Sequence, residues 1–186
     1  CFRESGEETV TIEVAEGSSV AATVLVLKYL YTFMIEINSD NVFEVLAAAD
    51  KLQLAGLRES CEAYLAKHLC QDSVCSTWKA SHMLGLSQLG EKCKALVMSE
   101  GRAVLEGGSF VELPKELALA VVADEELNAS EEAVFEAVVA WGEANKGAGS
   151  VQDAVADFVP HLRFVEMGHA FIYNRVRQSG LIPESI

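Results

Sequence analysis

The sequence predicts a mainly α-helical protein, with a small α+β part at its N-terminal end and an all-helical part after it. Residues alternate between polar and apolar over Thr9–Val14, as they do in a half-buried strand. Only one further short run, Ile35–Ile37, shows this alternation. From about Asp72 onward, apolar residues recur at helical spacing and no strand pattern is visible. The boundary between the two parts is therefore expected near Lys67.

The N-terminal part is expected to form a strand, a helix, a second strand and two further helices. Gly17–Ser19 makes a turn and a helix cap, and an apolar helix follows over Val20–Tyr31. One face of this helix carries Val20, Val24, Leu27 and Tyr31. Asn38–Asp40 caps the next helix, in which Val42, Val45, Leu46, Ala49 and Leu52 repeat at helical spacing. Ala55–Gly56 breaks that pattern, and a third helix carries Leu57, Cys61, Tyr64 and Leu65.

The second part is expected to consist of stacked pairs of helices. Its first two helices are marked by Val74, Trp78 and Ser81, and by Leu89, Cys93, Leu96 and Val97. A further helix follows Pro114, because proline suits the first turn. The clearest amphipathic pattern covers Ser130–Trp141, with a serine cap and acidic residues in the first turn. Residues 151–159 and 168–177 are also predicted to be helical, and Gly180 ends the last helix.

The composition excludes several classes of protein. The 186 residues are 51% hydrophobic, which is enough for a packed core and excludes intrinsic disorder. The net charge of −14 argues against nucleic acid and against anionic membrane surfaces as partners. The longest apolar stretch, Val20–Ile35, is broken by Lys28 and falls short of a membrane-spanning helix. We therefore expect neither nucleic acid nor membrane to be bound.

The five cysteines are odd in number and include no CxxC pair. Cys61 and Cys93 lie among apolar helical residues, where a free thiol acts as a small hydrophobe. This usage is typical of a reducing compartment, so we expect the protein in the cytoplasm, with the nucleus as the second candidate compartment. Cys70 and Cys75 are too far apart for the paired ligands of a zinc site. No metal or cofactor is expected.

Two glycine-rich spacings approach catalytic motifs without completing them. Gly142–Gly147 has the spacing that opens a phosphate loop, but Ala148–Gly149 stands where lysine and serine or threonine are required. Gly85–Gly90 is one residue too long for a nucleophile elbow around Ser87, and a corner between two helices is the better interpretation. The protein is therefore expected not to be an enzyme. A small helical hydrolase that uses Ser87 or a Cys/His site stays a remote alternative.

Two ordered sets of residues carry a resemblance to a known family. The first set is Tyr29–Thr32, Ile35–Ile37, Asn41–Val42, Ala47–Leu54, Leu57, Cys61 and Tyr64–Leu65. The second set is Cys75, Leu89, Cys93, Phe110, Leu113–Pro114, Glu131, Val134–Phe135, Ala137–Val138, Trp141, Leu162–Phe164, Met167 and Gly180–Ile182. The first resembles the second half of a BTB (POZ) domain, and the other resembles the BACK domain that follows BTB in Kelch-like proteins. The resemblance implies the C-terminal part of a BTB domain over residues 1–67. It implies a BACK domain over residues 68–186, with 3-box-like helices at its start.

The same resemblance implies a function. BTB–BACK proteins of this type serve as substrate-recognition subunits of cullin-3 RING ubiquitin ligases. The BTB domain grips the cullin, the 3-box helices extend that grip, and a further domain, which we do not find in this sequence, captures a protein substrate. The substrate therefore cannot be inferred. The rival interpretation within the family is a BTB–BACK protein that acts as a structural or transcriptional scaffold without cullin.

The family contacts the cullin through a hydrophobic-x-Glu motif, and Phe2–Glu4 stands at the corresponding place. Phe2 would fill a pocket on the cullin, and Glu4 would orient it through a charge-assisted hydrogen bond. An ordinary exposed loop is the alternative for these residues. Weaker candidates for the cullin-facing groove lie in the first helices after BTB, and each is alternatively a core residue: Val74, Trp78 and Leu84.

The sequence departs from the family pattern in three places. The first half of the BTB domain is absent, together with the helices that form the family's homodimer, so a homodimer is expected only through those missing residues. Phe33 stands where the family has glycine after Tyr-Thr, which puts the geometry of that turn in question. Val74 replaces the usual asparagine before Cys75.

Overall fold

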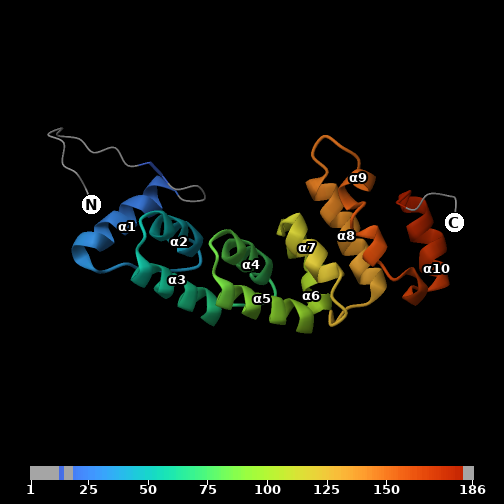
Figure 1. Ribbon diagram of the computed structural model, residues 1–186, viewed down its shortest axis with the longest axis horizontal. Coiled ribbons are helices and arrows are strands. Elements are labelled where there is room, and N and C mark those ends of the chain that lie inside the picture. Colours follow the sequence, from blue (N-terminus) through green and yellow to red (C-terminus); the bar gives the residue numbers. More distant parts are fainter. Residues whose placement is uncertain (1–12, 15–18, 182–186) are drawn as a thin grey trace. The chain divides into compact units, whose positions relative to one another are not determined.

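The computed structural model describes residues 13–14 and 19–181, and the chain divides into two compact units, Cys1–Lys67 and His68–Ile186. All regular structure in the described residues is helical (Figure 1). The prediction of a mainly α-helical protein is therefore confirmed.

The N-terminal unit is built from helices that pack on one another in chain order. These helices are α1 (Val20–Thr32), α2 (Val42–Lys51) and α3 (Ala55–Lys67). Their shared core is formed by Val26, Val45, Leu46, Leu57 and Cys61. Ser19 begins α1, because its hydroxyl accepts a hydrogen bond from the backbone N–H of Ala22 at 3.1 Å. The same hydroxyl donates to Glu44 at 2.5 Å and so ties the start of α1 to α2.

Helix α1 buries a different side from the apolar face that the sequence predicts. Ala22 and Val26 are buried in the unit. By contrast Val20, Val24 and Tyr31, which the sequence places on one face, are 67%, 56% and 88% exposed. Leu27, the fourth residue of that predicted face, is half-buried, so most but not all of the face is exposed in the described residues.

The prediction of a strand at Ile35–Ile37 is wrong, because these residues carry no regular structure and form no β-ladder. A strand needs a partner for its backbone groups. Here a side chain replaces that partner: the Asn41 amide accepts from the N–H of Asn38 and donates to the carbonyl of Glu36, both at 2.9 Å. The other predicted strand, Thr9–Val14, lies outside the described residues except for its last two positions, which carry no regular structure.

The C-terminal unit is entirely helical in its described residues, up to 181. Its longer helices are α4 (Val74–Met83), α5 (Ser87–Ser99), α6 (Gly101–Glu106), α7 (Lys115–Val122) and α8 (Glu131–Asn145), followed by α9 (Val151–Val155) and α10 (His169–Phe171). Shorter turns are η1 (Ser109–Glu112), η2 (Val159–His161), η3 (Phe164–Glu166), the π-helical η4 (Ile172–Val176) and η5 (Arg177–Ser179).

Helix α8 is the central element of this unit. The predicted start at Ser130 is confirmed, since its hydroxyl accepts from the N–H of Ala133 at 3.3 Å. Trp141 is buried, and its indole N–H donates to the carbonyl of Leu113 at 2.8 Å. Its ring packs against Phe158 with centroids 5.0 Å apart. Trp141 therefore links α8 to the residues before α7, through Leu113, and to the residues after α9, through Phe158.

The structure shortens one of the two helices predicted near the C-terminus and confirms the other. Helix α9 ends at Val155, whereas α10, η4 and η5 follow one another without a break over 169–179, where a helix over 168–177 is predicted. Residues five apart share a face in a π-helix, so Phe171 and Val176 both turn toward the unit. Gly180, in the left-handed region at φ 66°, ends the segment as predicted.

Candidate protein-interaction site

The predicted cullin-contacting residues do not all lie together at the surface. Phe2 and Glu4 lie outside the described residues. Val74 and Trp78 are buried in the C-terminal unit, whereas Leu84 is half-buried at the end of α4. The first two therefore have no surface to offer a partner in this structure, because they are part of the core.

The α4–α5 hairpin explains this burial. Val74, Trp78 and Ser81 lie at helical spacing on the inner face of α4, where the Ser81 hydroxyl donates to the carbonyl of Trp78 at 2.7 Å. Gly85 turns the chain with φ 66°, and the N–H of Leu86 donates to the carbonyl of Ser81 at 2.8 Å. The expected corner between two helices is therefore present, and Ser87 is simply the first residue of α5.

The outer end of the hairpin carries an apolar residue that the sequence analysis missed. Met83 is 65% exposed at the last position of α4, next to the half-buried Leu84. The sequence spacing could have identified this residue, because Met83 follows Val74 by nine residues, or two and a half helical turns. Met83 therefore lies on the side of α4 opposite to the core face. Exposed methionine is a common feature of binding surfaces, since its side chain adapts to different partners.

The cysteines of this unit have different environments. Burial raises the pKa of Cys93 to about 12, and burial also raises the pKa of Cys75, to whose sulfur the Ser109 hydroxyl donates at 3.5 Å. Cys70 is exposed before α4, and the hydroxyl of Ser73 lies 3.3 Å from its sulfur and lowers its pKa. The buried thiols stay protonated and act as core residues, whereas Cys70 is the more reactive of these three.

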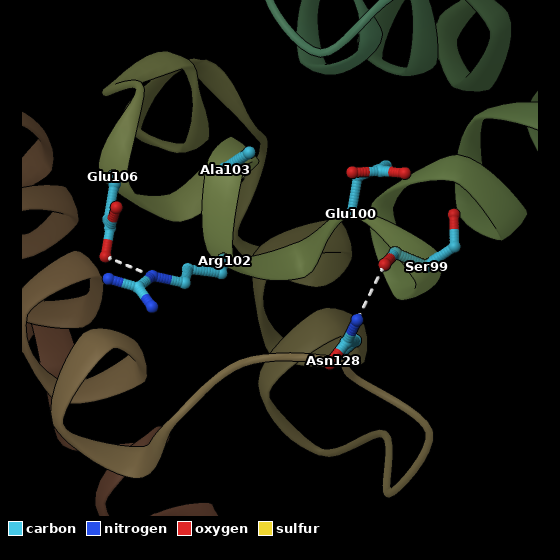
Figure 2. Close-up of a pocket in the computed structure, with 6 residues that line it drawn as sticks. All are labelled: Ser99, Glu100, Arg102, Ala103, Glu106 and Asn128. Carbon is cyan, nitrogen blue, oxygen red and sulfur yellow. Dashed lines mark hydrogen bonds and ion pairs between the residues drawn. The ribbon is translucent and has the colours of Figure 1, made fainter.

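A shallow hollow lies where α5, α6 and the loop before α8 meet, and Figure 2 shows its lining. The Asn128 amide donates to the carbonyl of Ser99 at 3.0 Å, and Arg102 pairs with Glu106 at 2.9 Å. The Ser99 hydroxyl donates to its own helix, at the carbonyl of Leu96. These groups are engaged with one another, and the lining contains no histidine that could activate the serine.

No three His, Cys, Asp or Glu side chains in the described part of the chain lie close enough together to hold a metal ion. No helix found in the same part is long and apolar enough to cross a membrane.

Comparison with protein families gives two matches that follow each other along the chain. The family model described as BTB/POZ domain matches residues 2–69, and the model described as BACK, "BTB And C-terminal Kelch", matches residues 74–177. The BACK match alone covers more than half of the chain. It includes the α4–α5 hairpin and the whole of α8.

Individual curated proteins are similar over most of the chain. Human Kelch-like protein 11 is 28% identical over 183 residues, which are 98% of this chain and 24% of that protein. Human Kelch-like protein 35 is 28% identical over 168 residues, or 89% of this chain and 28% of that protein. Human BTB/POZ domain-containing protein 6 is 30% identical over 124 residues, or 67% and 23%. The chain thus spans about a quarter of the length of these relatives.

Proposed function

The chain belongs to the BTB–BACK family, and from that premise we propose that it is a protein-interaction adaptor of a cullin-3 RING ubiquitin ligase. In this role it performs no catalysis. It would hold the cullin at its N-terminal side, and a substrate would be held by a domain outside these residues. The observation that carries the proposal is the order of the two matches, BTB and then BACK, in a single chain.

The proposal assigns residues 1–67 to the C-terminal part of a BTB domain and residues 68–186 to the BACK domain. The division of the structure between Lys67 and His68 supports this assignment. The α4–α5 hairpin then takes the place of the 3-box. A homodimer would form through the first half of the BTB fold, which these residues do not include.

The cullin contact is proposed to have two parts. Phe2 is the apolar anchor and Glu4 the carboxylate that orients it, as the resemblance implies. In the hairpin, Met83 and Leu84 supply the contact, because they have accessible apolar surface. Val74 and Trp78 act indirectly. Because they are buried, they hold α4 against α5 and so position Met83 and Leu84 at the end of α4.

Titration of the cullin-3 N-terminal domain tests the proposal. It is made with the 186-residue chain and with the same chain joined to a complete BTB N-terminal half. The variants are Phe2→Ala with Glu4→Lys, and Met83→Asp. The matched control is Val165→Asp, because Val165 is 98% exposed and far along the chain from both proposed contacts.

Binding that both variants weaken about tenfold or more, while the control binds like the wild type, supports the adaptor and its two contacts. Absence of binding by the folded, dimeric longer chain contradicts the ligase role. In that case the cullin-independent scaffold takes its place.

A further inference from the structure

The C-terminal segment of residues 163–177 contains only short helices. It consists of the three-residue η3 turn and most of an eleven-residue helical run, 169–179, in which α10, η4 and η5 follow one another without a break. Isolated helices shorter than about 12 residues are marginal in water, because nucleation is unfavourable. The segment therefore keeps its shape through contacts with the rest of the C-terminal unit rather than through its own backbone hydrogen bonds.

Three carboxylates in the first two turns of α8 make polar contacts with this segment. Glu131 accepts from the backbone N–H of Arg163 at 3.1 Å, near the segment's start. Glu132 accepts from the N–H of Gly168 at 2.9 Å, in the middle. Glu136 makes the third contact, near the end of the segment. Each bond involves an ionised acceptor and is stronger than a neutral hydrogen bond.

The third contact is a two-point ion pair. The two oxygens of Glu136 accept from Nε and Nη2 of Arg175, at 2.6 and 2.7 Å. Arg175 lies in the η4 turn, and both side chains of the pair are partly exposed. Water and salt can therefore reach this contact, and its strength depends on ionic strength.

Few residues attach the segment through apolar contacts. Met167 and Val176 are its two buried residues, and the Phe171 ring meets Phe135 of α8 edge to face, with centroids 5.7 Å apart. On the other side, Val165 and Tyr173 are exposed among the large apolar residues of the described chain. The helices before the segment also bury residues of their own, among them Trp141 and Phe158, whose rings pack together.

We propose that residues 163–177 form a strap that detaches from α8 as a unit while α4 to α8 stay folded, and that Glu131, Glu132 and Glu136 set how often it detaches. Detachment uncovers Phe135 and the apolar face of α8 around it. The fold thus contains a local opening step whose equilibrium is governed by three carboxylates. Such sub-global opening occurs where few apolar contacts and exposed polar bonds hold a segment.

Native-state hydrogen–deuterium exchange on the 186-residue chain, resolved by peptide, tests the proposal. The variants are Glu132→Ala, Glu136→Ala and the two together. The matched control is Glu143→Ala, which removes a carboxylate of the same helix that pairs with Lys146, the residue just after the helix, at 2.8 Å. We expect exchange of the strap peptides to rise about tenfold in each single variant and further in the double variant. Peptides from α4, α5 and the second half of α8 should exchange at the wild-type rate in these variants. In the Glu143→Ala control, the strap peptides should also exchange at the wild-type rate.

Two results would overturn the proposal: strap exchange in the double variant equal to that of the wild type, or an equal rise in α5 and in the strap. The second result would mean that the carboxylates stabilise the whole unit. Raising the salt concentration should also accelerate strap exchange in the wild type and have little effect in the double variant.

Swapping the two charges of the Glu136–Arg175 pair separates the loss of this contact from a general loss of stability. Glu136→Arg and Arg175→Glu should each accelerate tryptic cleavage after Arg163 and Arg177, because each removes the ion pair. The two changes together restore an ion pair at the same place and should return the cleavage rate to near the wild-type value. Cleavage of the double variant as fast as that of the single variants would contradict a role of this pair as a latch.

Discussion

The backbone N–H of Phe33 donates to the carbonyl of Tyr29 at 2.8 Å, and their rings meet edge to face with centroids 6.2 Å apart. This bond ends α1 with Phe33 in the left-handed region, at φ 54° and ψ 19°. Glycine is the usual residue there, because a Cβ atom strains this conformation by about 1–2 kcal/mol. Phe33 therefore adopts the left-handed backbone conformation in which glycine usually ends a helix.

A comparison of two substitutions measures the strain at Phe33. Phe33→Gly and Phe33→Ala both remove the contact with Tyr29, but only glycine relieves the left-handed backbone. We expect the glycine variant to be more stable than the alanine variant by about 1 kcal/mol, after glycine's own entropic cost. Urea unfolding of both variants gives the difference. Equal stabilities would mean that the turn rearranges in the alanine variant.

Gly142 is predicted to tolerate no side chain. A Cβ atom there would lie 2.4 Å from a methyl carbon of Val155 and 3.0 Å from one of Val151, so α9 would have to move. Overpacking of this kind costs about 1–3 kcal/mol. Gly142→Ala should lower the free energy of unfolding by that amount, and Val155→Ala in addition should recover part of the loss. Gly56→Ala is the control, since a Cβ atom at this helical position meets no atom within 4 Å. It should not destabilise, and a loss in both variants would contradict the packing argument.

The strap contact of Glu132 predicts a dependence on pH. The N–H of Gly168 donates to this carboxylate and lowers its pKa in the folded protein. A lowered pKa adds stability that is present above the unfolded value of about 4.3 and is lost as the pH falls through the folded value. Strap exchange in the wild type should therefore rise on acidification. In Glu132→Ala the rise should be smaller, and an identical pH profile in the two proteins would contradict this role of Glu132.

Thiol labelling distinguishes the cysteines. Cys70 is exposed with a lowered pKa, whereas Cys61, Cys75 and Cys93 are buried with raised values, about 11 for Cys61. Alkylation followed by peptide mapping should modify Cys70 in the folded protein and the other three only on unfolding. Ser73→Ala should slow the labelling of Cys70, because the hydroxyl that lowers its pKa is then gone. Labelling of Cys93 at the same rate as Cys70 would contradict the burial described above.

Local patterns predicted most helices, and long-range contacts account for what was missed. Ser130 with its acidic first turn marked the start of α8, and Gly180 marked the end of the last turn. The ion pair between Glu136 and Arg175 joins residues 39 positions apart, so no local sequence pattern could predict it. The alternation at Ile35–Ile37 predicted a strand, but a strand depends on a partner elsewhere in the chain.

The candidate site was predicted less well than the fold. The resemblance implied a contact on α4, but a residue's place in a motif does not say which side of the helix it occupies. Val74 and Trp78 proved to be core residues. Counting helical turns from Val74 would have identified Met83 as an outward residue. Whether Phe2 and Glu4 contact a partner stays a prediction, because they lie outside the described residues.

The most direct test of the adaptor account is the hydrogen-exchange footprint of the cullin-3 N-terminal domain on this protein, in the forms used for the titration. The account predicts slower exchange in the peptide that contains Phe2 and Glu4 and in the peptide that contains Met83 and Leu84. The strap at 163–177 should exchange as it does in the free protein. No complex with the folded longer chain, or slower exchange confined to the strap, would contradict it.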